Sequence, residues 1–259
     1  MARKPSAPKE QKRPAVWELY ERLVARLIAD QLDTGYCVTP NASVAGQISG
    51  RQRQIDVLID QRHTTDNRRR IIVDAKVRTR SIDVTHVEAF RGLMDDVEAT
   101  HGYLVCPIGF TPAALRRAQE AVSIRLLPLD HLDDFDPSSW PDCVVESCNG
   151  GKVFWDGYPS FDMTLVPLND PTKWPQRVSF IHYVGKCDRC RRFHVKCTSC
   201  GDLFSVTHDS AEDYGTQCSC KHPWFWLASI EEDENGRKSA ELHFVAGAST
   251  ILTVDRRSI

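Results

Sequence analysis

Six of the ten cysteines are concentrated in one short stretch of the C-terminal half of the chain. They form three close pairs: Cys187 and Cys190, Cys197 and Cys200, Cys218 and Cys220. Thiolates at this spacing wrap a tetrahedral Zn²⁺, and a segment that closes around a metal folds into tight turns joined by short strands. We therefore expect a zinc-binding, β-rich domain over residues 181–259.

The second and third pairs are expected to share one metal. Cys197-Thr198-Ser199-Cys200-Gly201 has the form of a metal-binding knuckle in which the glycine eases the turn after the second cysteine. Cys218 and Cys220 form the opposing knuckle, and the arrangement resembles a zinc ribbon. Four thiolates leave no open coordination position, so the expected role of Zn²⁺ is structural.

The pair formed by Cys187 and Cys190 leaves two alternatives open. The pair could bind a second metal together with His194 or another histidine, or it could replace one of the two pairs assigned above. The remaining four cysteines are scattered and are expected to be ordinary core residues: Cys37, Cys106, Cys143 and Cys148.

The N-terminus, Met1-Ala2-Arg3-Lys4-Pro5, lacks the apolar core of a signal peptide, and no apolar run approaches the length of a membrane span. We expect a cytoplasmic protein, in which paired cysteines bind metal rather than form disulfides. The net charge of −2 excludes neither an acidic nor a basic partner, because the charge is unevenly distributed.

Residues 15–132 show alternating helical and strand-like patterns, which are typical of an α/β fold. The expected helices cover residues 15–32, 84–97 and 111–122, and the expected strands cover residues 55–59, 70–77, 101–107 and 124–129. The first two strands are joined by a charged loop and are expected to form a long-looped hairpin.

Beyond residue 130 the pattern changes to short strands and turns. Asn149-Gly150-Gly151 and Asn235-Gly236 are turn sequences that predict two β-hairpins, between residues 144–147 and 152–155 and between residues 224–230 and 240–245. Four regions are expected from these patterns: a disordered basic tail over 1–14, a catalytic domain over 15–132, a linker and hairpin region over 133–180, and the zinc domain over 181–259.

Acidic and basic side chains interrupt the apolar hairpin. Because side chains alternate along a strand, Asp74 and Lys76 point the same way while Val73 and Ala75 face the core. Asp56 lies inside an apolar strand, where a carboxylate is costly unless a partner neutralises it. Mg²⁺ is usually held by one or two carboxylates together with water and substrate phosphate. The hairpin therefore predicts a divalent metal site with a lysine beside it.

Glu21 is the fourth candidate. It lies within the apolar stripe of the first expected helix, whereas Glu18 lies beside that stripe. An acid within a buried stripe often approaches a site, so Glu21 is grouped with Asp56, Asp74 and Lys76.

These residues occur in a recognisable order. The segment from Gln47 to Ile59 (QISGRQRQIDVLI) resembles the motif around the first metal-binding aspartate of Mrr-like nucleases, and Val73-Asp74-Ala75-Lys76 resembles their D/E-x-K motif. The continuation over residues 86–113 resembles their helix–strand–helix continuation. The resemblance covers residues 15–129 and places the chain in the PD-(D/E)XK, restriction-endonuclease-like superfamily.

This resemblance implies an αβββαβ core with a mixed central sheet, dependence on Mg²⁺ or Mn²⁺, and hydrolysis of phosphodiester bonds. Glu21, Asp56, Asp74 and Lys76 match the catalytic positions, with Asp56 and Asp74 as Mg²⁺ ligands. The acid before Lys76 is Asp where many relatives have Glu, which shortens its reach. Family members often use a polar residue on the next helix, and His86 and Glu88 remain alternatives here.

Two basic runs are expected to contact nucleic-acid phosphate. Residues 51–80 hold nine Lys and Arg against four Asp, and residues 186–196 hold five against one. The expected phosphate contacts include Arg51, Arg53, Arg68, Arg69, Arg70, Arg78 and Arg80. Trp224, Phe225 and Trp226 could stack on bases, but the core of a small metal domain is the preferred interpretation.

The expected function is thus a Mg²⁺-dependent endonuclease that acts on nucleic acid. Double-stranded DNA is the expected substrate. The resemblance suggests prokaryotic defence or DNA processing, with a regulatory protein partner or self-association as further options. The alternative is a non-catalytic protein that keeps the nuclease fold and binds nucleic acid or recruits an effector through its zinc domain.

Overall fold

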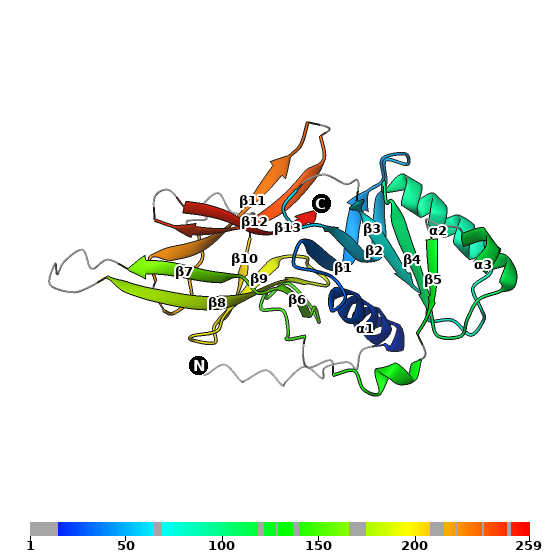
Figure 1. Cartoon of the computed structure of the whole chain (residues 1–259), viewed down its shortest axis with the longest axis horizontal. Coiled ribbons are helices and arrows are strands. Elements are labelled where there is room, and N and C mark those ends of the chain that lie inside the picture. Colours follow the sequence, from blue (N-terminus) through cyan, green and yellow to red (C-terminus); the bar gives the residue numbers. More distant parts are fainter. Residues whose placement is uncertain are drawn as a thin grey trace, which may run out of the picture.

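The computed structural model shows an α/β unit on one side and a β-rich unit on the other (Figure 1). It describes residues 15–64, 69–118, 122–127, 129–136, 140–165, 175–207, 215–220, 222–234, 236–247 and 250–259. The tail expected over residues 1–14 lies outside the described residues. No described helix is both long enough and apolar enough to cross a lipid bilayer.

The α/β unit is built on a five-stranded mixed sheet with the strand order β1-β2-β3-β4-β5. The first three strands are antiparallel, and β4 and β5 continue parallel to β3. The expected mixed α/β core is therefore confirmed. Its elements are α1 (Val16–Ala29), β1 (Tyr36–Ala45), β2 (Gln52–Gln61), β3 (Ile71–Ala75), α2 (Val84–Asp96), β4 (His101–Cys106), α3 (Pro112–Ala118), β5 (Val122–Leu126) and the short 3-10 helix η2 (Leu129–Leu132).

Strand β1 was not expected from its own sequence pattern. Pro40 and Asn41 interrupt it, and Asn41 has a positive φ of 48°. The strand forms because it lies at the edge of the sheet, where proline is tolerated, and because it pairs with β2 from Tyr36↔Gln61 to Ala45↔Gln52. The hairpin expected between the next two strands is confirmed as β2 and β3, with Val57 opposite Val73.

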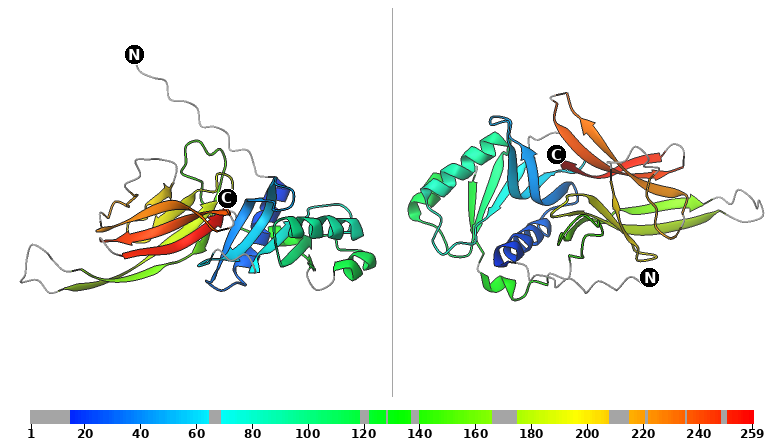
Figure 2. Two further views of the ribbon diagram at one scale, coloured as in Figure 1. Left: turned by 90° about the horizontal axis from the view of Figure 1, so that it is seen from above. Right: turned by 180° about the vertical axis from the view of Figure 1, so that it is seen from behind.

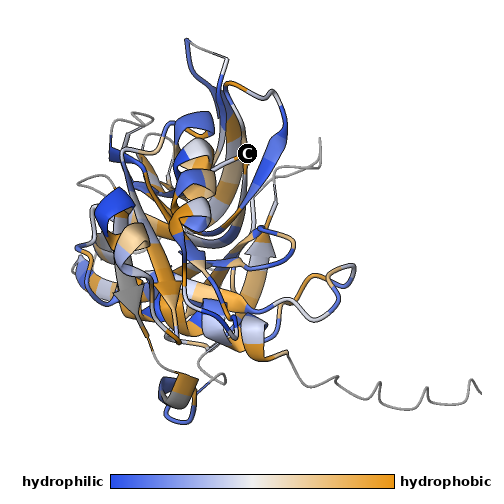
Figure 3. Cartoon of the chain, turned by 90° about the vertical axis from the view of Figure 1, so that its right-hand side faces the viewer, coloured by the Kyte–Doolittle hydropathy of each residue, from blue (hydrophilic) through white to orange (hydrophobic). Residues whose placement is uncertain are grey.

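Helices cover both faces of this sheet. Helices α2 and α3 lie on the outer face, and α1 lies on the face turned toward the β-rich unit (Figure 2). Alternation along β3 divides the core as expected, because Ile72 packs in the cluster under α2 and α3 while Val73 and Ala75 pack in the cluster under α1. The helices show hydrophilic and hydrophobic stretches in alternation, which fits elements with one buried face (Figure 3).

The β-rich unit contains two sheets that share a core. One has the order β10-β9-β8-β6, with β7 also paired to β8, and the other has the order β11-β12-β13. The strands are β6 (Val153–Gly157), β7 (Ser160–Leu165), β8 (Gln176–Cys187), β9 (Phe193–Cys197), β10 (Leu203–Val206), β11 (Trp224–Glu232), β12 (Lys238–Ala246) and β13 (Thr250–Ser258). The boundary expected between residues 180 and 181 falls inside β8.

One of the two expected hairpins is present and the other is not. Strands β11 and β12 pair as expected, with Gly236 at a positive φ of 75° in the turn between them, while Asn235 lies outside the described residues. The hairpin expected around Gly150 is wrong in its first strand: residues 144–147 form no strand, and the pairing across this turn is an antiparallel bridge between Asp142 and Lys152, while β6 pairs with β8. Residues 143–151 instead form a loop whose two cysteines face a pair on β8 and the turn after it.

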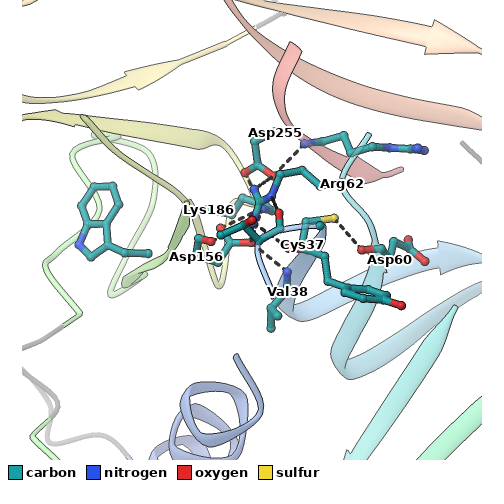
Figure 4. A network of polar contacts seen from close by, with 12 residues as sticks. Cys37, Val38, Asp60, Arg62, Asp156, Lys186 and Asp255 are labelled. Atoms are coloured by element: carbon teal, nitrogen blue, oxygen red, sulfur yellow. Dashed lines mark hydrogen bonds and ion pairs between the residues drawn. The ribbon is translucent and has the colours of Figure 1, made fainter. Parts of the chain in front are cut away.

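A cluster of buried charges joins the two units (Figure 4). The Lys186 ammonium on β8 contacts Asp156 at 3.2 Å and Asp255 at 2.6 Å, and Arg62, which follows β2, contacts the same two carboxylates. Burial opposes the charge on Lys186, but the two carboxylates outweigh it and raise its pKa. The cluster thus connects β2, β6, β8 and β13.

Candidate active site and metal centres

The four candidate catalytic residues come from three elements of the α/β unit. Asp56 is on β2, Asp74 and Lys76 are at the end of β3, and Glu21 is on the face of α1 that covers these strands. The backbone N–H of Ala75 donates a hydrogen bond to Asp56 Oδ2 at 2.8 Å, which fixes this carboxylate against β3. Lys76 Nζ lies 2.6 Å from Asp74 Oδ1. The fold therefore brings the hairpin residues together as expected.

Burial and mutual repulsion keep protons on two of the acids. The pKa of Glu21 is raised to about 8 by burial first, and then by the charges of Asp56, Glu18 and Asp74, while Lys76 opposes the shift. The pKa of Asp56 is raised to about 7 by burial and by the neighbouring Asp74. The charges of Asp56 and Asp74 raise the pKa of Glu21, so the three carboxyl groups are electrostatic neighbours.

A pocket of about 310 Å³ opens beside Glu21 and Asp56. Its walls come from α1, from β1 and β2, and from the turn that follows β8. The lining residues are Trp17, Glu18, Glu21, Arg22, Pro40, Asn41, Gln54, Asp56, Asp188 and Arg189. A group of neighbouring carboxylates suits a hard divalent cation such as Mg²⁺, because the positive charge of the cation would offset the repulsion between the ionised acids.

A family model for restriction endonucleases, Mrr_cat, matches residues 15–135. Over these residues the chain is similar to restriction endonucleases, and this part is called here the restriction endonuclease domain after the model that it matches. The similarity implies a nuclease that acts on nucleic acid, and enzymes of this type typically use a divalent metal. The match covers the four candidate catalytic residues and the pocket walls supplied by α1, β1 and β2.

Other comparisons add little. A search of curated proteins finds no match. Among solved structures, the chain is similar to one titled as a protein of unknown function, AF1548, with 15% sequence identity and a TM-score of 0.37. That similarity covers 51% of this chain and 72% of the other.

Outside the restriction endonuclease domain, the expected cysteine site of the second and third pairs is assembled. The ligand atoms of Cys197, Cys200, Cys218 and Cys220 all lie within 4.8 Å of one another. Gly201 follows the second cysteine with a φ of 80°, and its N–H donates to the Cys197 carbonyl at 2.9 Å, as expected for a knuckle. Four sulfurs at this spacing fit a tetrahedral structural Zn²⁺.

The pair formed by Cys187 and Cys190 lies beside two cysteines that were not expected to be metal ligands. Cys187 and Cys190 cluster with Cys143 and Cys148, again within 4.8 Å, so the interpretation of Cys143 and Cys148 as plain core residues is wrong. The Sγ–Sγ distances are 3.7 Å for Cys143 and Cys190 and 3.6 Å for Cys148 and Cys187. The two Cys₄ groups are consistent with two structural zinc ions.

A glycine supports this second assignment. A Cβ added at Gly151 would lie 2.5 Å from the sulfurs of both Cys148 and Cys187, so only glycine leaves room for the cluster. His194, one of the histidines considered for this metal, lies next to the group with Nε2 3.3 Å from Cys143 Sγ, but the four cysteines supply four ligands without it. The spacing Cys143-x₄-Cys148 followed by Gly150-Gly151 could have indicated the missing pair.

Several basic residues that were expected to contact phosphate are buried instead. Arg70 is 4% exposed and pairs with Asp60 at 2.9 Å, and Lys186 is fully buried in the charge cluster described above. Arg51, Arg69, Arg78 and Arg80 remain exposed, and Arg68 lies outside the described residues. The local charge count could not distinguish these groups, because it does not show which charges are buried and paired with each other.

The remaining candidates have structural partners. His86 Nδ1 contacts Asp83 at the start of α2, and Glu88 accepts a hydrogen bond from Arg117 of α3. Trp224 and Trp226 are buried in the core of the β-rich unit, where Trp224 stacks on Phe180 at 4.2 Å. The preferred interpretation of these tryptophans as core residues is confirmed.

Proposed function

We propose that the protein is a Mg²⁺-dependent endonuclease that hydrolyses phosphodiester bonds in DNA. The observation that carries this proposal is the closeness of Asp56 to Asp74 and Lys76, with Glu21 and Asp56 lining a pocket. Glu21 and Asp56, whose pKa values are raised by burial and by neighbouring acids, are poised to exchange protons for a divalent cation. A non-catalytic protein would have no need for several acids and a lysine to lie close together.

In the proposed mechanism, Asp56 and Asp74 hold the metal, and Glu21 completes the acidic wall on α1. When bound, Mg²⁺ neutralises charge on the scissile phosphate and lowers the pKa of a coordinated water. Lys76 lies beside Asp74 and orients the attacking water or accepts its proton. Arg51, Arg78 and Arg80 are exposed on the same domain and bind the flanking backbone.

We propose that the β-rich unit is a zinc-binding domain that supports the nuclease, and that the enzyme serves prokaryotic defence or DNA processing. The similarity of the catalytic segment to Mrr-like nucleases supports the second statement. Defence and DNA processing would act on different nucleic acids. The two roles are therefore separated by testing unmodified and modified phage DNA, plasmid, single-stranded DNA and RNA as substrates.

The deciding experiment incubates the full chain with each of these nucleic acids in Mg²⁺, Mn²⁺ or EDTA. Cleavage with Mg²⁺ or Mn²⁺, lost in EDTA and in Asp74→Ala, is the expected result. Binding of DNA without cleavage under every metal condition would favour the non-catalytic alternative.

A further inference from the structure

The turn formed by residues 187–190, called here the first cysteine turn, belongs to the β-rich unit but forms a wall of the catalytic pocket. Asp188 and Arg189 line that pocket together with Glu21 and Asp56. The two middle residues of the turn are thus placed at the site, while the flanking Cys187 and Cys190 face Cys143 and Cys148. A metal bound to these cysteines would fix the turn from behind.

Three contacts anchor Asp188 to the restriction endonuclease domain and to the loop before β6. Its carboxylate accepts hydrogen bonds from Arg22 of α1 at 2.8 Å and from the backbone N–H of Lys152 at 2.8 Å. Its carbonyl accepts from Asn41 Nδ2 at 2.7 Å. The Arg22–Asp188 pair is buried, so Arg22 is neutralised and is not available to a phosphate.

Backbone strain is concentrated at the same contact. Asn41 and Arg191 have φ values of 48° and 60°, and Arg191 Nε donates to the Asn41 carbonyl at 3.0 Å. In the turn formed by residues 197–200, the equivalent position is Gly201, which adopts a positive φ without strain. A positive φ is unfavourable for arginine. Arg191 is retained at this position because its side chain connects the first cysteine turn to β1.

Arg189 is the exposed cation of the pocket. Its side chain is 48% exposed, and its guanidinium contacts Glu18 Oε1 at 2.9 Å and the Asn149 carbonyl at 3.0 Å. These contacts hold the group across the mouth of the pocket, on a rigid turn. A planar guanidinium matches a phosphate with two parallel hydrogen bonds, which lysine does not do.

We propose that Arg189 binds a backbone phosphate of the nucleic acid at the mouth of the catalytic pocket, where the first cysteine turn presents it. This inference rests on the proposed nuclease function. It makes the β-rich unit part of the substrate site, because the restriction endonuclease domain supplies the acids and the metal-binding turn supplies the cation that faces them.

The test compares Arg189→Ala with Arg177→Ala, which removes the same charge from an exposed position on β8 that is not part of the pocket. DNA affinity is measured in EDTA at one salt concentration, and KM and kcat are measured with Mg²⁺. Arg189→Ala is expected to weaken DNA binding and raise KM by about tenfold or more, with a melting temperature close to that of the wild type. Arg177→Ala is expected to change both by less than about twofold.

Equal effects of the two substitutions would overturn the inference, and so would a loss of melting temperature in Arg189→Ala with unchanged KM, which indicates a structural role. If the wild type binds DNA but never cleaves it, the nuclease proposal fails while the affinity comparison still decides the role of Arg189.

A separate observation concerns a second pocket, of about 380 Å³, between the β1–β2 hairpin and the β11–β13 sheet. Its cationic lining residues are Arg70, Arg237, Lys238 and Arg256, and its one acidic lining residue is Asp233. Arg70 is paired with Asp60, and Arg237 with Glu98. Arg256 is only 5% exposed, and its buried Nη1 has no hydrogen-bond partner within the part of the chain that the structure describes.

A buried guanidinium nitrogen that lacks such a partner is unfavourable unless an anion accepts its hydrogen bonds. The volume lies within the range of small-molecule sites. We infer that this second pocket binds an anion that carries a phosphate or polyphosphate group. Because the pocket is lined from both units, its ligand would contact the two of them at once.

Pyrophosphate is the probe, in the absence of divalent metal. It is expected to raise the melting temperature of the wild type and of Arg189→Ala, but not that of Arg256→Met. No shift in the wild type, or an equal shift in Arg256→Met, would overturn the inference. If Arg256→Met does not fold, Lys238→Ala, at an exposed position, is expected to reduce the shift. DNA affinity that also depends on Arg256 would identify the nucleic-acid backbone as the source of the phosphate, and independence would identify a small phosphorylated ligand.

Discussion

Arg22 on α1 and Asp188 in the first cysteine turn form a buried ion pair with an Nη2–Oδ2 distance of 2.8 Å. The two residues are 166 positions apart in the sequence. The pair connects a helix of the restriction endonuclease domain to a cysteine turn of the β-rich unit, directly at the candidate catalytic pocket. Four of the five predictions that follow depend on this connection or on the acids next to it.

The ion pair should be important for stability. Removing one partner leaves the other charge buried without compensation, so Arg22→Ala and Asp188→Ala should each lower the free energy of unfolding by about 3–5 kcal/mol. Arg26→Ala removes a more exposed pair with Asp30 on the same helix and a hydrogen bond to the Trp155 carbonyl, and it should cost less, about 1–2 kcal/mol. Urea unfolding measures all three. Similar values for Arg22→Ala and Arg26→Ala would contradict the prediction.

Two zinc ions per chain are expected from metal analysis of the purified protein. Cys148→Ser should remove one ion and reduce DNA cleavage, because the first cysteine turn is no longer fixed at the pocket. Cys200→Ser should remove the other ion and reduce cleavage less, because its site is not part of the pocket. A single zinc ion in the wild type, or a disulfide within either Cys₄ group, would show that the assignment is wrong.

Stabilisation by Mg²⁺ should increase with pH. The pKa values of Glu21 and Asp56 in the folded, metal-free protein are raised to about 8 and about 7, from ordinary values of 4.5 and 3.8. The folded state therefore binds protons more tightly than the unfolded chain, and this contribution to stability is lost as the pH rises toward about 8. Mg²⁺ competes with the same protons.

The measurement is the melting temperature with and without Mg²⁺ at several pH values. The increase caused by Mg²⁺ should be small near pH 6 and largest above pH 8. Glu21→Gln keeps that side chain neutral, so its metal-free melting temperature should fall less between about pH 7 and pH 8. A Mg²⁺ effect that does not change with pH would contradict the assignment of these acids.

Replacement of Lys76 should affect turnover more than binding. Lys76→Ala removes the group proposed to orient or deprotonate the water, while the metal ligands and the exposed arginines remain. A general acid–base group typically contributes about 10²–10⁴-fold to the rate. Single-turnover cleavage and DNA affinity, measured at one salt concentration, separate the two effects. Cleavage at the wild-type rate would mean that Lys76 is not the catalytic lysine.

The buried charge cluster should also be sensitive to single substitutions. Lys186→Met leaves Asp156 and Asp255 with Arg62 as their remaining cationic partner among the contacts described, and it should lower the free energy of unfolding by about 3–5 kcal/mol. Lys152→Met changes an exposed pair with Asp142 and is the matched control. Equal unfolding curves for the two variants would show that the cluster does not hold the units together.

The sequence determined those features that depend on close neighbours along the chain. Alternation in β3 placed Val73 and Ala75 toward the core under α1, with Ile72 on the opposite face. Helical periodicity predicted a buried stripe that contains Glu21, and in the structure this side chain is partly buried beside Tyr20. The C-x-x-C and C-x-C spacings were sufficient to group Cys197 with Cys218, because each pair is preformed within a turn. A period or a spacing is enough to predict such features.

Other features were decided only by the tertiary structure, because their partners are far apart in sequence. Cys143 became a candidate metal ligand through its position opposite Cys190, and Arg70 is buried against Asp60 and against Ser258 of β13 instead of being exposed as expected. Arg189 lines the candidate catalytic pocket, next to Asp188, which is anchored to α1 and β1. These positions depend on the burial of charges and sulfurs against elements that are distant in sequence. A local sequence pattern therefore does not predict them.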